Sequence, residues 1–277
     1  LIPPSIVMII YAVSTSESAG KLCIAGIVPG ILLAALLMLV TYATARRKNF
    51  PTLPRASGRE IWDSFKDAFW GLMLVVIVMG GIYGGIFTPT EAAAVSAVYA
   101  FIAAVFIYRG LKLRAVPKVL LSAANTSAML LYIITNAILF SFLLTSEQIP
   151  QVLAHWVVDQ QLSPWMFLMA INVALLVAGQ FMEPSSIILI LAPLLVPIAK
   201  TMGIDPIHLG VIMTVNMEIG MIHPPVGLNL FVASHIAKMG LTEVSIACLP
   251  WVFVLLAYLI LITYVPAVSL WLPNLLY

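Results

Sequence analysis

Apolar residues dominate long stretches of the chain, and polar residues gather in the short segments between them. A helix that crosses a bilayer needs about 20 mostly apolar residues. Runs of this kind cover residues 22–45, 71–87, 90–108, 119–145 and 243–265. The pattern predicts an all-α polytopic membrane protein.

Two further apolar stretches contain helix-breaking residues. Residues 164–201 form two short arms around the polar segment Gly179–Ser186, which includes Glu183 and Pro184. Such residues at membrane depth need a protein-enclosed or wet cavity, so this stretch predicts a re-entrant hairpin. Residues 206–219 and 226–237 flank Pro224-Pro225 and predict a broken membrane helix.

A Pro-Pro pair occurs twice, and the two occurrences look like copies. Pro3-Pro4 and Pro224-Pro225 each precede an apolar stretch, and the shift that takes Pro3 to Pro224 also takes Pro29 to Pro250. Helices broken at equivalent points of two halves are the best sequence indication of a transport site.

The charges predict how these segments cross the membrane. Segments 46–66 and 109–118 are basic, whereas 146–163 has no Lys or Arg, so the first two should be cytoplasmic and the third external. Counting crossings then sets the segments after the two Pro-Pro pairs in opposite directions, which predicts an inverted repeat. Residues 59–70 mix charged and aromatic residues at helical spacing and predict an interfacial amphipathic helix.

These signals divide the chain into consecutive parts. They are 1–45 as the end of a first repeat, 46–70 as basic loop and interfacial helix, 71–145 as membrane helices of a scaffold, 146–163 as external loop, 164–201 as hairpin, 202–238 as broken helix and 239–277 as last membrane helix. Leu1 stands directly against the first Pro-Pro pair, so we expect a longer protein whose preceding hairpin completes the first copy.

Composition supports membrane insertion and excludes several other classes. The chain is 62% hydrophobic and 9% charged, whereas soluble proteins are about 45–50% apolar and about 25% charged. A net charge of +2 does not suggest nucleic acid. Cys23 and Cys248 are expected as small apolar residues rather than a disulfide. The sequence has no metal-ligand spacing, phosphate loop or hydrolase triad, so we expect neither an enzyme nor a cofactor.

The breaks have a definite chemistry. Carbonyl oxygens before a Pro-Pro pair lose their helical partners and suit a small cation such as sodium. The N–H groups of the half-helix that restarts after the pair suit a carboxylate. Gly220 and Gly227 frame the second pair and permit unusual backbone angles. The alternative is a proline kink without a ligand, and two breaks in register favour a site.

Several polar residues near the breaks have two interpretations. Ser185 and Ser186 are candidate cation ligands, but Ser185 also suits the N-cap of the returning arm. Glu183 either binds a cation or accepts hydrogen bonds from its own turn. Asn216 and Asn229 either contact a polar substrate or bridge helices.

Three other polar features carry weaker signals. Thr88-Pro89-Thr90-Glu91 has the pattern of a capping box, which favours a structural role. Glu218 is a second acidic residue within a membrane helix. His223 lies inside the second break and would titrate near neutral pH, which makes it a candidate for proton coupling.

The chain resembles the large membrane (M) subunit of the tripartite ATP-independent periplasmic (TRAP) transporters. The similarity lies in Leu1–Ile6, Gly81–Ala94, Gly179–Pro197 and Gly220–Phe231, which follow the family's order over nearly the whole chain. The resemblance implies an inverted-repeat elevator transporter of the bacterial inner membrane that imports an organic anion with sodium as coupling ion. It also implies two partners, a small membrane (Q) subunit, separate or fused, and a periplasmic substrate-binding protein.

The resemblance also implies the residues of the sites. The expected sodium-binding residues are Gly179, Glu183, Ser185, Ser186, Gly220, Met221, His223 and Val226 for one site and Ile2, Pro3 and Ser5 for the other. The expected substrate-binding residues are Pro4, Asn216, Pro225, Gly227 and Asn229.

Two departures and several alternatives remain at this point. The family commonly has Thr at the position of His223, and its first hairpin is absent from the chain. Sialic acid and C4-dicarboxylates are both plausible substrates. An ion channel with the hairpin as its filter, or a membrane subunit without a transport site, are the alternative functions.

Overall fold

The structure, a computed structural model, describes residues 1–2, 5–50, 54–148, 152, 159–160, 162–224 and 227–276. Its elements in these residues are all helices, which confirms the all-α prediction. The chain forms two compact units. Unit 1 comprises Leu1–Thr44 and Ile133–Tyr277, and unit 2 comprises Ala45–Tyr132.

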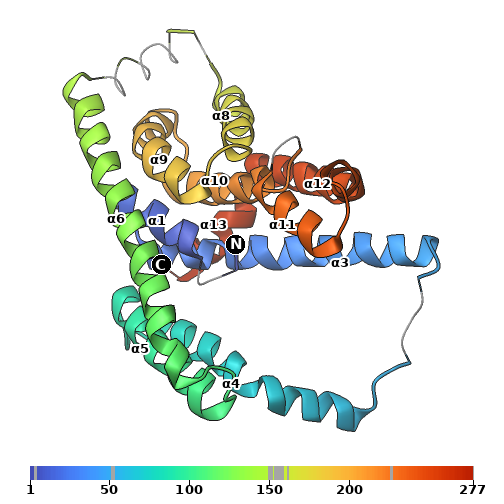
Figure 1. Cartoon of the computed structure of the whole chain (residues 1–277). Coiled ribbons are helices and arrows are strands. Elements are labelled where there is room, and N and C mark those ends of the chain that lie inside the picture. The colour runs from blue at the N-terminus through green and yellow to red at the C-terminus, as the bar shows by residue number, and fades with distance from the viewer. Residues whose placement is uncertain are drawn as a thin grey trace. The chain divides into compact units, whose positions relative to one another are not determined.

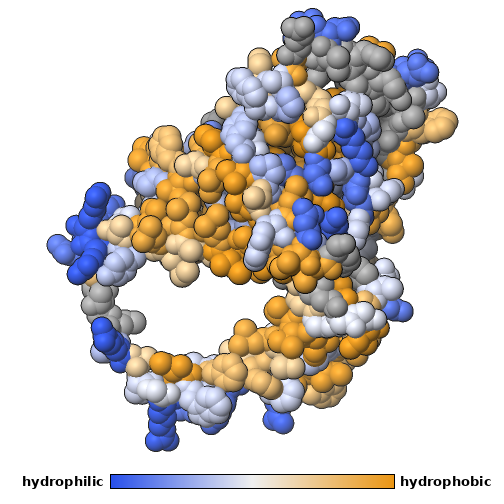
Figure 2. Space-filling view, turned by 180° about the vertical axis from the view of Figure 1, so that it is seen from behind, coloured by the Kyte–Doolittle hydropathy of each residue, from blue (hydrophilic) through white to orange (hydrophobic). Residues whose placement is uncertain are grey.

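Five helices of the described chain are long and apolar enough to cross a membrane. They are Ala19–Arg47, Gly58–Ile82, Thr90–Ile107, Pro184–Thr201 and Leu241–Tyr264. Broad hydrophobic areas lie on the surface in Figure 2. Such areas suit contact with lipid or with other membrane subunits rather than with water.

Unit 2 is built around a helical hairpin of α4 (Gly58–Tyr83) and α5 (Pro89–Ile102). The π-helix η1 (Ala103–Ile107), the 3₁₀-helix η2 (Leu113–Ala115) and the start of α6 (Val116–Ser146) follow. Two tyrosines join the hairpin, because Tyr99 Oη donates to Trp70 O at 2.8 Å and Tyr108 Oη to Asp67 O at 2.7 Å.

Helix α4 differs from the sequence prediction in its extent. The interfacial helix expected at 59–70 and the apolar run at 71–87 form one continuous helix as far as Tyr83. The reason is that no proline or cap interrupts the chain at Gly71, and a single glycine costs a helix only about 1 kcal/mol. The capping box predicted at the start of α5 is confirmed, with Glu91 N donating to Thr88 Oγ1 and Thr88 N to Glu91 Oε2.

Unit 1 is organised around α10 (Pro206–Gly220), which contacts most of its other helices. From Ile207 to Gly220 only Glu218 is exposed. Apolar residues lie on all sides of the helix between a few buried polar ones, which is the pattern of a buried helix. Its neighbours include α8 (Pro164–Gly179), α9 (Pro184–Thr201), α12 (Leu241–Tyr264) and α13 (Ala267–Leu276) (Figure 1).

The same succession of helices follows each Pro-Pro pair. After the first pair comes the ten-residue helix α1 (Ile6–Thr15) and then an apolar span made of α2 (Ala19–Ala25) and α3 (Ile27–Arg47). After the second comes the ten-residue helix α11 (Leu228–Ala237) and then the apolar helix α12. The helical stretches expected after both breaks are therefore present.

Helices α3 and α12, which carry the matching Pro29 and Pro250, run antiparallel to each other. Trp251 Nε1 donates to Thr41 Oγ1 at 3.2 Å, and Tyr258 Oη donates to Pro29 O at 2.7 Å. As the chain advances from 251 to 258, its partner on α3 moves back from 41 to 29. These two hydrogen bonds therefore set α3 and α12 in opposite directions.

The capping box of α5 gives a local prediction. Thr88→Ala removes the acceptor of the Glu91 N–H and should cost the first turn of α5 about 1 kcal/mol. Hydrogen exchange measured by mass spectrometry should therefore speed up several-fold at residues 91–92, while Thr90→Ala in the same turn serves as the control. Equal exchange in the two variants would contradict the capping role.

Candidate functional site

The tip of the hairpin between α8 and α9 is organised by one carboxylate. Glu183 is the N-cap of α9 and accepts from Ser186 N at 3.1 Å. Ser185 Oγ donates to Glu183 Oε1 at 2.7 Å, and Ser186 Oγ donates to Oε2 at 3.4 Å. The alternative that Ser185 is the N-cap is wrong, because Pro184 starts the helix and the Glu183 side chain reaches forward to its first turn. The alternative that Glu183 accepts hydrogen bonds from its own turn is confirmed.

Two glycines bring the hairpin against the second broken helix. Gly179 ends α8 and Gly220 ends α10, and a Cβ atom on Gly220 would lie 2.8 Å from Gly179 Cα. Backbones approach this closely only where neither residue has a side chain. The sequence-predicted glycines therefore meet at the point where both helices stop.

The second break gathers backbone oxygen atoms around Gly227. Gly227 has φ of +38°, and a Cβ there would lie 3.0 Å from both Met221 O and His223 O. Asn229 N donates to Met221 O at 3.0 Å, which ties the start of α11 to the end of α10. The local geometry joins carbonyl groups to the N-terminal end of a helix, as the sequence predicts for a broken helix.

A side-chain contact links the hairpin to the break. Gln180 Nε2 lies 3.4 Å from His223 Nδ1. Because an amide nitrogen only donates, this contact requires an unprotonated Nδ1. Sequence reasoning missed Gln180, although it lies within the polar segment singled out as the hairpin tip.

The first break is described only in part. Ser5 is the N-cap of α1 and accepts from Met8 N at 3.5 Å. Ile2 packs against Gly30, where a Cβ would lie 2.7 Å from Ile2 Cγ1. Pro3 and Pro4, and likewise Pro225 and Val226 of the second break, lie outside the described residues.

Asn216 belongs to a buried polar chain in the core of unit 1. Its Nδ2 donates to Asn172 O at 3.0 Å and to Asn172 Oδ1 at 2.9 Å, while Asn172 Nδ2 donates to Thr263 Oγ1 at 2.8 Å. Asn216 Oδ1 is buried and has no hydrogen-bond partner. The structure thus shows Asn216 bridging helices, whereas Asn229 is exposed on α11. Asn172 was missed, although it is the one amide in an otherwise apolar arm.

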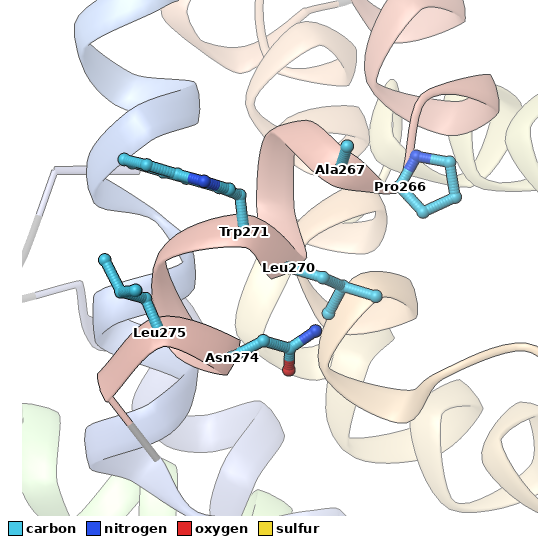
Figure 3. A pocket seen from close by; sticks show the side chains of 6 residues that line it. All are labelled: Pro266, Ala267, Leu270, Trp271, Asn274 and Leu275. Carbon is cyan, nitrogen blue, oxygen red and sulfur yellow. The ribbon is translucent and has the colours of Figure 1, made fainter.

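Two pockets of unit 1 lie elsewhere. One of about 340 Å³ is lined at the start of α10 by residues including Asp205 and His208. The other, of about 500 Å³, is lined by Pro266, Ala267, Leu270, Trp271, Asn274 and Leu275 (Figure 3). Neither lining includes a predicted site residue. Within the described part of the chain no cluster of three or more His, Cys, Asp or Glu suits a metal ion.

Comparison with known proteins gives a consistent result. A family model described as the DctM component of the tripartite ATP-independent periplasmic transporters matches residues 1–268. The C4-dicarboxylate TRAP transporter large permease protein DctM of Rhodobacter capsulatus is 59% identical over 290 residues, with 100% of the chain and 66% of that protein covered. The protein of the same name from Pseudomonas aeruginosa is 60% identical over 274 residues, covering 99% of the chain and 64% of that protein.

A more distant relative has a different stated substrate. The sialic acid TRAP transporter large permease protein SiaM of Vibrio cholerae is 38% identical over 275 residues, with 99% of the chain and 64% of that protein covered. The chain spans about two thirds of the length of these relatives.

The contact between Gly179 and Gly220 gives a prediction on stability. Gly220→Ala places a methyl group against backbone atoms that cannot rotate away, and such overpacking costs about 1–3 kcal/mol. The thermal midpoint of the purified protein, followed by tryptophan fluorescence, should fall.

Gly80→Ala is the matched control, because a Cβ at Gly80 of α4 meets nothing within 4 Å. This change should leave the midpoint unchanged or raise it, since alanine favours helix. If both variants shift the midpoint alike, the two glycines are not in close contact.

Proposed function

The chain belongs to the family of the DctM component of the tripartite ATP-independent periplasmic transporters, and on this premise we propose that it forms part of a sodium-coupled importer of C4-dicarboxylates. The identities of 59% and 60% to proteins named for C4-dicarboxylates, against 38% to one named for sialic acid, support this choice of substrate. The protein would act in the bacterial inner membrane, where its apolar spans cross the bilayer.

The observation that carries this proposal is the meeting of the hairpin and the broken helix at Gly179 and Gly220. Two helix ends meet there, and Gln180 of the hairpin tip lies 3.4 Å from His223 of the break. Broken helices of this kind supply carbonyl oxygens for sodium and N–H groups for an anion in secondary transporters. We therefore place one sodium site between segments 179–186 and 220–226.

The remaining predicted residues are assigned by the same reasoning. Ile2, Pro3 and Ser5 would contribute to a second sodium site at the first break. Gly227 and Asn229, at the start of α11, would face the substrate carboxylate together with Pro4 and Pro225, because a helix N-terminus favours an anion. Asn216 is buried in the core of unit 1, so it would contribute through the packing of α10 rather than by touching the substrate.

The antiparallel course of α3 and α12 supports an inverted repeat, the architecture on which an elevator movement would be built. Sodium would supply the energy, because each ion that moves down 100 mV releases about 2.3 kcal/mol. A periplasmic binding protein would deliver the substrate. A small membrane subunit would complete the assembly. The name of a relative, the isethionate TRAP transporter permease protein DctMQ of Oleidesulfovibrio alaskensis, joins the letters M and Q of the two membrane subunits and supports this proposal.

A transport assay tests the proposal directly. The full-length protein with its small subunit is reconstituted in proteoliposomes, and the binding protein is added with labelled succinate or sialic acid. Succinate uptake should require both an inward sodium gradient and the binding protein, and sialic acid uptake should stay at background. Uptake that is unchanged when choline replaces sodium would refute the coupling.

The hairpin tip gives a more specific prediction. Ser185→Ala removes the hydroxyl that donates to Glu183 at 2.7 Å. Because this hydroxyl is also a proposed sodium ligand, its loss should raise the half-saturating sodium concentration about tenfold, which corresponds to about 1.4 kcal/mol of binding free energy. Ser96→Ala, which removes a hydroxyl bonded within α5 of unit 2, is the control. Identical sodium curves for the two variants would place the sodium site elsewhere.

A further inference from the structure

A pair of buried amides joins α8 to α10. Asn172 and Asn216 are 5% and 0% exposed, and buried apolar residues such as Leu175 and Met217 surround this level of the two helices. Asn216 Nδ2 uses both of its hydrogen atoms on Asn172, one on the backbone oxygen and one on Oδ1. The pair is therefore a directional contact in an otherwise non-directional interface.

The amide pair and the glycine contact belong to the same interface. Gly220 follows Asn216 by four residues and Gly179 follows Asn172 by seven, spacings that keep each pair of residues on one helix face. Apolar side chains alone fit together in more than one register, and a slip by one turn moves a helix by about 5 Å. The two hydrogen bonds of Asn216 are satisfied only in the observed register.

The energetic pattern also indicates a role in positioning rather than in stability. Asn216 Oδ1 is buried without a partner, which is unfavourable in an apolar interior. A single buried asparagine in an apolar helix interface is a well-attested means of fixing register at the expense of stability. Asn172 is in turn held from α12, because its Nδ2 donates to Thr263 Oγ1 at 2.8 Å.

We propose that Asn172 is a positioning residue that fixes the register of α8 against α10 by holding Asn216, and so places Gly179 against Gly220. Its consequence for transport rests on the proposed sodium site between the hairpin and the break. Loss of the pair would leave the two helices packed but free to settle in a second register, which would separate the oxygens of the hairpin tip from those of the break.

The register is tested without any transport measurement. Cysteines are introduced at the exposed positions Val177 and Glu218 of the full-length protein, and Cys23 and Cys248 are replaced by serine. Spin labels are attached to the two new cysteines. The distance between the labels is then measured by pulsed electron paramagnetic resonance. Replacing both asparagines, Asn172→Leu and Asn216→Leu, should shift the distance or add a second population displaced by about 5 Å, one helical turn. Ser269→Ala, which removes a buried hydrogen bond between α10 and α13, should leave it unchanged.

An unchanged distance distribution in the double variant overturns the proposal. If the leucine variants do not fold, Asn172→Ser removes the same acceptor with a smaller side chain, and the same criterion applies to it. The thermal midpoint of the double variant should equal or exceed that of either single variant, because each single variant leaves one buried amide without its partner. If the pair served stability alone, the double variant would have the lowest midpoint.

The link to transport is tested separately by sodium-dependent uptake. Asn172→Leu should raise the half-saturating sodium concentration about threefold to tenfold, the range of one buried hydrogen bond between membrane helices, and Ser269→Ala should not. If the register shifts and the sodium curve does not change, the link to the sodium site is refuted, but the proposal that Asn172 fixes the register still holds. Wild-type uptake without sodium dependence refutes the proposed function, whereas the spin-label result still decides the register.

Discussion

Inside a bilayer no water replaces a lost backbone hydrogen bond, so a helix can be interrupted only where the protein supplies other partners. Unit 1 meets this constraint by burying α10 among its neighbours and by setting its broken end against a second helix end. Gly179, Gly220 and Gly227 allow the backbones to approach, and the N–H of Asn229 satisfies the carbonyl of Met221. The break is thus possible because the surrounding helices enclose it.

The similar succession of helices after the two Pro-Pro pairs also has a physical basis. Each Pro-Pro pair is followed by a ten-residue helix and then by a long apolar span, so the same local signals produce the same succession twice. Tyr258 and Trp251 of α12 then bond to α3 and hold the two equivalent spans antiparallel.

The sequence was most informative where local chemistry decides the structure. Apolar runs coincide with four of the five helices that are long and apolar enough to cross a membrane in the described chain, and the fifth, Pro184–Thr201, was expected as a short hairpin arm. Proline and glycine located the breaks, and Thr88 with Glu91 located a helix start. It was least informative where distant residues decide. The close approach of Gly179 to Gly220 and the contact of Asn172 with Asn216 join positions more than forty residues apart, and no spacing within one helix indicates such a partner. Glu183 and Ser185 are both acceptable N-cap residues by type, and the sequence alone does not show that the helix begins at Pro184 and so has Glu183 as its cap.

The isolation of α10 has a consequence for how the protein responds to its surroundings. Only Glu218 of this helix is exposed between Ile207 and Gly220. A thicker or thinner bilayer therefore acts first on long exposed helices such as α3, which respond by tilting. A change in bilayer thickness would affect helix α10 only indirectly, through the helices that pack around it.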